Sequence, residues 1–266
     1  MRSYLLTCLT ALLAGPAPLL AQISVVGEMI HEREALPGTT YDGMLVVRNT
    51  TSEPQQARIH QTDYRFYADG RSFYGEPGST PRSNAAWLTI SPALVTIPAG
   101  EVVRIHYRVQ LPDAPSDSLH GTYWSMLIVE GVKAPRTTPT RPGHLTLRPT
   151  IRHGVQVVTH VGSTGAPSIA FAQPVLGGTS QDGFSLEVDL SNEGDRASRI
   201  DATLELFTQE GRSVASLRSA RGLVYPGSSI RQRFDLGTLS PGRYTALVMA
   251  DAGADAVAGA QFTLSF

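Results

Sequence analysis

Cysteine is almost absent from this sequence. The single example, Cys8, lies in an apolar run near the start, between Arg2 and the leucine-rich end Leu19-Leu20-Ala21. This pattern predicts a signal peptide over residues 1–21, and the apolar run is too short to span a bilayer. A chain cut after Ala21 has no cysteine, which excludes disulfides and thiolate metal sites. We therefore expect export to the periplasm, with the cell surface or the medium as the alternative.

The chain also lacks an excess of charge of either sign. The chain has 22 Lys+Arg against 23 Asp+Glu, for a net charge of −1. A balance near zero gives no reason to expect nucleic acid or an anionic membrane surface as a partner. No membrane span is expected after the signal peptide.

Catalytic and metal-binding motifs are lacking as well. All seven histidines precede residue 161, but none is paired at the spacing of metal ligands, and neither HExxH nor GxSxG occurs. The acidic residues are scattered and form no visible acid/base pair. We expect no cofactor, no metal and no enzymatic activity, which leaves an enzyme acting on cell-wall polymer as the weakest alternative.

Short β-strands dominate what the sequence does contain. From Ile23 onward, runs rich in Val, Ile, Thr and Tyr alternate with turn signals, and no stretch keeps a helical period for long. This predicts an all-β protein with two tandem immunoglobulin-like sandwiches, over residues 22–162 and 163–266. Residues 23–30 are expected to form one strand, and residues 162–167 a linker between the domains.

The two halves repeat each other in order and spacing. LVVRNTTSEPQQARI matches LEVDLSNEGDRASRI, and IPAGEVVRIHYRVQL matches VYPGSSIRQRFDL, which indicates an internal duplication. Tyr123 and Tyr244 each follow a glycine by two residues at the start of the penultimate strand. Both are therefore expected to form a tyrosine corner with the preceding loop. Trp87 and Trp124 are predicted to serve in packing.

One long alternating stretch, residues 145–161, stands out from these strands. Its odd positions are mostly aliphatic and its even positions mostly polar, which predicts a strand with one apolar and one polar face. Pro149 lacks an amide hydrogen and favours a position at a sheet edge. The preceding residues 132–144 hold three prolines and no periodicity, so they are expected to form a long loop.

The first domain resembles the N-terminal domain of periplasmic pilus-assembly chaperones, the PapD-like family. The resemblance covers about residues 23–161. It rests on four segments: Leu45–Thr51, Trp87–Pro92, Ile97–Ile105 with its Pro-Ala-Gly-Glu turn, and Tyr123–Val129 leading into the long loop and alternating final strand. It implies a chaperone that lends this final strand to an incomplete pilin-type sandwich by strand addition. An outer-membrane assembly partner is a further expectation.

The resemblance also implies roles for residues of the final strand. The donated row would consist of Leu145, Leu147, Ile151, Val155 and Val157. A basic residue would capture the client's terminal carboxylate, with Arg152 as the first candidate and Arg148 as the second. On this view, replacing Val155 and Val157 by Asp should abolish client binding and leave the monomer folded.

Three features depart from the family pattern. The first strand offers only Arg33 as its basic residue, and Glu32 and Glu34 flank it. His153 and Gly154 interrupt the hydrophobic row, and Pro149 deletes one backbone donor. The alternative function is a structural or adhesive component of a secreted or surface complex, in which the tandem sandwiches act as spacer and docking surface.

Overall fold

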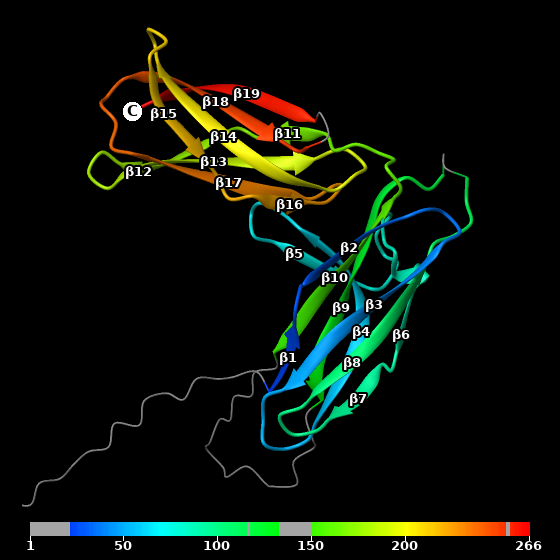
Figure 1. The fold of residues 1–266 in the computed structure, drawn as a ribbon. Coiled ribbons are helices and arrows are strands. Elements are labelled where there is room, and N and C mark those ends of the chain that lie inside the picture. The colour runs from blue at the N-terminus through cyan, green and yellow to red at the C-terminus, as the bar shows by residue number, and fades with distance from the viewer. Residues whose placement is uncertain (1–21, 116–117, 133–150, 254–255) are drawn as a thin grey trace, which may run out of the picture.

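The protein consists of β-strands, apart from one short 3-10 helix, η1 (Ala85–Trp87). The structure is a computed structural model that describes residues 22–115, 118–132, 151–253 and 256–266. It holds two β-sandwiches that meet at an angle (Figure 1). The predicted all-β fold with tandem immunoglobulin-like sandwiches is confirmed. No helix in the described part of the chain has the length and apolar character needed to cross a membrane.

Two sheets form the first sandwich. One contains, in spatial order, β1 (Ile23–Val26), β3 (Thr40–Asn49), β8 (Val102–Gln110) and β6 (Leu88–Ser91). The other contains β2 (Ile30–Ala35), β10 (Arg152–Val161), β9 (Gly121–Val132), β4 (Gln55–Phe66) and β5 (Ser72–Gly75), with β7 (Leu94–Ile97) also paired to β4.

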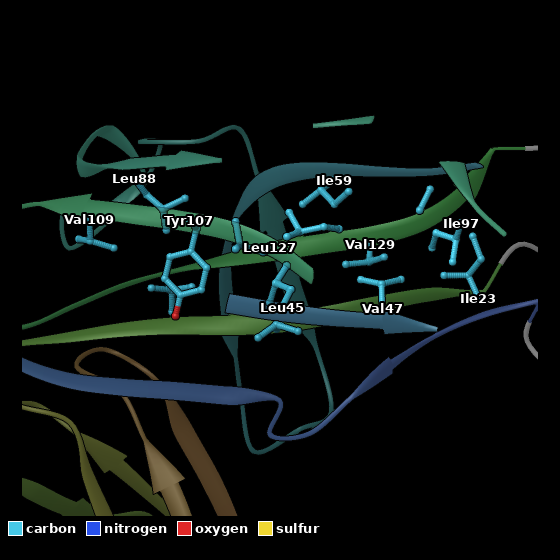
Figure 2. Packing of buried hydrophobic residues seen from close by; sticks show 14 of the residues in the cluster. Ile23, Leu45, Val47, Ile59, Leu88, Ile97, Tyr107, Val109, Leu127 and Val129 are labelled. Carbon is cyan, nitrogen blue, oxygen red and sulfur yellow. The ribbon is translucent and has the colours of Figure 1, made fainter. Parts of the chain in front are cut away.

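The core of this sandwich lies between the two sheets. Alternate residues of each strand point inward, as in β8, where Ile105, Tyr107 and Val109 are buried and their neighbours are exposed. They meet Leu45 and Val47 from the same sheet, and Leu127 and Val129 from the facing one (Figure 2). Burial of this continuous apolar layer stabilises a domain in which the described residues contain no cysteine.

The first strand passes from one sheet to the other. β1 pairs antiparallel with β3, whereas β2 pairs parallel with β10. Gly27 lies between them with a φ of +109°, a conformation that residues with a side chain rarely adopt. The single strand expected over residues 23–30 is therefore wrong: the glycine breaks it, and the two parts serve different sheets.

The second sandwich also has two sheets. In one, β11 (Ile169–Phe171) and β12 (Val175–Thr179) pair with one side of β13 (Gly183–Asn192), and β17 (Ser229–Gly237) pairs with the other side. The second sheet contains β15 (Ser213–Arg218), β14 (Ser198–Thr208), β18 (Arg243–Asp251) and β19 (Val257–Ser265), with β16 (Gly222–Val224) paired to β14.

The repeat found in the sequence is visible in hydrogen bonds. Asn49 and Asn192 occupy equivalent places, and both are fully buried. Each side-chain amide donates to the carbonyl four residues later, at 2.7 Å in the first domain and 2.8 Å in the second. Each also donates to the end of an equivalent strand, Ile97 or Val224. These similar bonds support the proposed internal duplication.

The tyrosine corner forms in one domain. The hydroxyl of Tyr244 donates to the carbonyl of Ser240 at 2.9 Å, as predicted. In the first domain, Tyr123 instead packs its ring against Trp87, with 4.7 Å between ring centroids, and against the guanidinium of Arg82. Packing has thus replaced the corner at the equivalent position.

Gly43 provides a test of the packing in the first sandwich. A Cβ atom there would lie 2.0 Å from Cζ of Tyr107, which is buried and bonded through its hydroxyl to Nδ1 of His31 at 2.8 Å. We expect Gly43→Ala to lower the free energy of unfolding by about 1–3 kcal/mol, as overpacking does. Urea denaturation measures this.

Gly131→Ala is the matched control. A Cβ at Gly131 would meet only the side chain of Ile23, at 3.6 Å. Its effect should stay within about 0.5 kcal/mol. Equal effects of the two substitutions would contradict the packing argument.

Candidate functional site

The strand predicted to contact a client, β10, turns its aliphatic row toward its own domain. Val155 and Val157 have no exposed surface and belong to the core of the first sandwich. They face Leu127 and Ser125 of β9 in register. In this conformation neither side chain is free to fill a client's groove. Aspartate at these positions would bury a charge, so the expectation that such variants leave the monomer folded does not hold.

The outer edge of β10 is covered along only part of its length. Its pairing with β2 begins at Gln156, whose amide donates to the carbonyl of Met29 at 2.8 Å, and ends at Val161. Hydrogen-bonding groups alternate between the two sides of a strand, so the N–H and C=O of Arg152 and Gly154 point to the same side as those of Gln156. Among the described residues, no strand pairs with that side before Gln156. The strand switch between β1 and β2 therefore leaves a short open edge.

Exposed apolar side chains surround this open edge. Ile151, directly before β10, is 41% exposed. Val26 and Met29, on either side of the strand switch, are 44% and 38% exposed. Of the predicted donor row, Ile151 is thus the described residue that a partner could contact. Leu145 and Leu147 lie outside the described residues.

Arg152 is already paired with a carboxylate of its own domain. Its Nε lies 2.8 Å from Oε2 of Glu130, the residue opposite it on β9. A client's carboxylate would have to compete with this ion pair, so the predicted capture role is not favoured by the geometry. Arg148 lies outside the described residues. Arg33 is exposed on β2, and its neighbours Glu32 and Glu34 are paired with arginines of the second domain.

Gly154 has a packing role on the opposite face of β10. A Cβ there would lie 2.4 Å from the sulfur of Met126, so the methionine side chain lies across the glycine. The interruption of the hydrophobic row at this position is explained by this close approach. His153, the other interruption, bonds through Nε2 to the carbonyl of Ile23 at 2.9 Å and so ties β10 to β1.

Further along the same face, the first domain meets the second. The rings of Trp124 on β9 and Tyr225 after β16 are stacked, with centroids 4.5 Å apart and planes 9° from parallel. Both side chains are buried, together with Val158 of β10 and Ala197. The indole Nε1 donates to the carbonyl of Tyr64 at 2.6 Å. The role of Trp124 in packing is confirmed, but the partner is the other domain.

The tyrosine hydroxyl and several charges complete this junction. Tyr225 donates to Oε1 of Gln156 on β10, and burial raises the pKa of its phenol. Arg199 pairs with Glu32 at 2.7 Å and Arg196 with Glu34 at 3.4 Å. A stacked, hydrogen-bonded and ion-paired contact of this kind holds the two sandwiches at a fixed angle. The second sandwich is thereby held beside the open edge of β10.

Sequence analysis missed Tyr225 as a junction residue. The repeat aligns Gly100 with Gly227, which both have a φ of +71°, and so aligns Tyr225 with Pro98. The available signal was that a large aromatic residue, Tyr225, stands in the second repeat where the first repeat has a turn proline, Pro98. What it contacts could not be deduced, because the partner comes from the other domain.

The described residues contain no group of three or more His, Cys, Asp or Glu side chains arranged to hold a metal ion. His106 is exposed on β8 and His60 is half-buried on β4, in different sheets. What this region offers is backbone hydrogen-bonding groups, apolar side chains and a rigid neighbour.

Comparisons with solved structures return fimbrial chaperones and their complexes. The chaperone in complex with the tip adhesin of CFA/I fimbriae aligns over 91% of this chain and 98% of its own, with 13% identity and a TM-score of 0.47. In fold, the chain resembles PapD-like fimbrial chaperones. The class 5 fimbriae chaperone CfaA gives 13% identity over the same shares and a TM-score of 0.46. The Salmonella enterica complex of pilin SafA with chaperone SafB gives 14% identity and a TM-score of 0.43. The alignment covers 94% of this chain and 99% of the other.

No family model matches the sequence, and no curated protein matches it. The likeness to fimbrial chaperones therefore concerns the fold, and the function has to be argued from the residues of this chain.

His160 makes the junction sensitive to pH. The hydroxyl of Thr122 accepts from the amide of Ala197 at 2.9 Å and forms a hydrogen bond with Nδ1 of His160, also at 2.9 Å. Burial, with a smaller effect of the Arg196 charge, lowers the pKa of His160 to about 4 from an ordinary value of 6.5. The native state thus keeps this imidazole neutral at a pH where the unfolded chain protonates it.

We expect stability to fall as the pH is lowered from 6.5 to 4, because over this range the unfolded state binds the extra proton. Allowing for partial solvent exposure, the loss due to His160 should be about 1–3 kcal/mol. Urea denaturation at several pH values measures it. His160→Gln should reduce the loss of unfolding free energy between pH 7 and pH 4. His106→Gln, at an exposed position of β8, should leave this loss unchanged. An unchanged slope in the His160 variant would contradict the assignment.

Proposed function

We propose that this protein is a chaperone-like binding protein of the periplasm, which holds an exported β-rich subunit by strand addition at the open edge of β10. The observation that carries the proposal is the uncovered stretch before Gln156, where Arg152 and Gly154 present backbone groups with no strand beside them in the described part of the chain. A strand of a client can pair there through main-chain hydrogen bonds.

Apolar contacts would add to these bonds. Ile151 is exposed at the start of the edge, and Val26 and Met29 lie beside the strand switch. In strand addition, backbone bonds supply much of the affinity and alternate side chains provide specificity. We propose that Ile151, together with Leu145 and Leu147, forms the contacting row. Val155 and Val157 would anchor the edge in its own core and not enter the client.

The rest of the structure supports this function by holding the edge in place. β9 pairs with the whole of β10, and the stacked Trp124 and Tyr225 tie the sheet to the second sandwich. An edge that is already ordered loses little conformational entropy on binding. The mechanism requires no nucleotide, metal or covalent step.

Co-purification with a client tests the proposal. The probe is an incomplete β-sandwich subunit encoded beside the gene of this protein, expressed with it and isolated as a soluble complex. Ile151→Asp should reduce the yield of complex about tenfold or more, because burial of an isoleucine is worth about 1.5–3 kcal/mol. Val175→Asp, at a 59% exposed valine of β12, is the matched control and should leave the yield unchanged.

Arg152 separates the backbone contribution from the side-chain contribution. Arg152→Pro removes an amide hydrogen that points to the open edge, and an edge position tolerates proline. It should weaken the complex several-fold. Arg152→Ala removes only an exposed ion pair with Glu130, so its effect should stay within about threefold.

The two arginine variants also distinguish the alternatives. A large effect of Arg152→Ala would restore the carboxylate-capture role. A complex indifferent to both Ile151→Asp and Arg152→Pro would exclude strand addition here. The alternative would then be a structural or adhesive component of a surface complex.

A further inference from the structure

A second exposed strand edge, on the other domain, has no protection against pairing. β19 is the outermost strand of its sheet. Within the described residues only β18 pairs with it, and β11 of the facing sheet approaches it without pairing. It is nine residues long and contains no Asp, Glu, Lys, Arg or Pro. Its register with β18 runs without a shift from end to end, so it has no bulge. Charge, proline and bulges are the usual means by which proteins blunt such an edge.

The other long outermost strand of this domain shows the contrast. β17 also has nine residues and carries Arg231, Arg233 and Asp235. β15, at the far side of the sheet that contains β19, ends in Arg218. β2, the outermost strand of the first domain's larger sheet, has Glu32, Arg33 and Glu34 in its six residues. Among the outermost strands of six or more residues in the described part of the chain, β19 is therefore the one without a charged residue.

The backbone groups available at this edge belong to the odd-numbered residues. At the two ends of the β18–β19 pair, Gly242 and Phe266 exchange hydrogen bonds, and the amide of Ala252 donates to the carbonyl of Ala256. The even residues of β19 therefore bond to β18, and the odd ones, from Val257 to Ser265, point their N–H and C=O outward. The side chains of these odd residues are exposed on the outer face of the sheet.

We propose that β19 is the interface of a two-fold symmetric dimer, in which it pairs antiparallel with β19 of a second copy of this chain. A two-fold axis at Gln261 lets all nine residues overlap. It sets Val257 against Ser265 and Gly259 against Thr263 of the second copy, so that outward-pointing groups meet each other throughout. Each such residue pair exchanges two hydrogen bonds. The two five-stranded sheets become continuous.

The side chains fit this register. On the inner face, Ala258 lies opposite Leu264 and Ala260 opposite Phe262, which places a small residue against a large one each time. Ala258, Ala260 and Phe262 are only half-buried in the single chain, so the dimer would cover apolar surface that is now partly open. A shift of the axis to residue 262 would instead oppose the two Phe262 rings and leave residues at the ends unpaired.

Charge favours a second copy as the occupant. Neither copy brings a charged residue to the seam. On the neighbouring β18, Arg243 lies level with Ser265 and Asp251 level with Val257. The antiparallel arrangement therefore places Arg243 of one copy in the same row as Asp251 of the other, and no like charges share a row. An isologous contact of this kind closes on itself and does not extend into a fibre.

Sedimentation velocity of the full chain at micromolar concentrations is the first test, with a reversible dimer expected. Gln261→Lys places two ammonium groups face to face on the axis and should lower dimer affinity at least tenfold. Gln261→Glu should do the same. An equimolar mixture of these two variants should recover the dimer as a heterodimer, since opposite charges then face each other.

Val214→Lys is the matched control, because it adds a charge to exposed β15 at the far side of the same sheet. It should leave the dimer affinity unchanged. Thermal denaturation followed by circular dichroism should show all variants folded, since Gln261 is exposed. A chain that stays monomeric, a mixture no more dimeric than either variant alone, or an equal effect of Val214→Lys would each overturn the proposal.

Discussion

The crossing of the first strand from one sheet to the other is the constraint on which the rest of the first domain depends. Gly27 permits the turn, after which β1 closes one sheet and β2 the other. Because β2 joins β10 only at Gln156, the start of β10 pairs with β9 alone among the described strands. A straight first strand would cover either all of β10 or none. The proposed binding edge thus follows from a backbone conformation and from no particular side-chain chemistry.

The junction between the domains holds the second sandwich beside that edge. Trp124 and Tyr225 pack face to face, and buried hydrogen bonds through Gln156 and Thr122 connect the same two sandwiches. Groups buried in this way must remain paired, which makes partial opening costly. His160, whose pKa is lowered by burial, bonds to Thr122 in this network, so acid should weaken the junction.

The two strand edges proposed as binding surfaces differ in how they are protected. The start of β10 is short, and the charges of β2 lie next to it. β19 is long, regular and uncharged. A short edge suits a partner that brings its own strand and many side-chain contacts, whereas a long self-complementary edge suits an identical copy. Both rest on the same property, namely backbone groups that have no partner within the described chain.

The sequence by itself determined the class of fold, because period-two alternation and turn residues are local signals. It also determined the repeat, whose buried asparagines Asn49 and Asn192 make equivalent bonds. The tertiary structure decided the direction in which each alternating row points. Val155 and Val157 would look alike facing their own core or a client, and only the packing of β9 and β3 against them shows that they face inward.

The candidate site could be predicted only in outline for the same reason. Ile151 and Val155 belong to one row in the sequence, yet one is exposed and the other fully buried, because the sandwich ends between them. The partner of Arg152 lies 22 positions away, at Glu130, and the partner of Trp124 lies in the other domain. Contacts between distant residues depend on register and on how the sheets pack. Local sequence does not encode these, so only the folded chain reveals them.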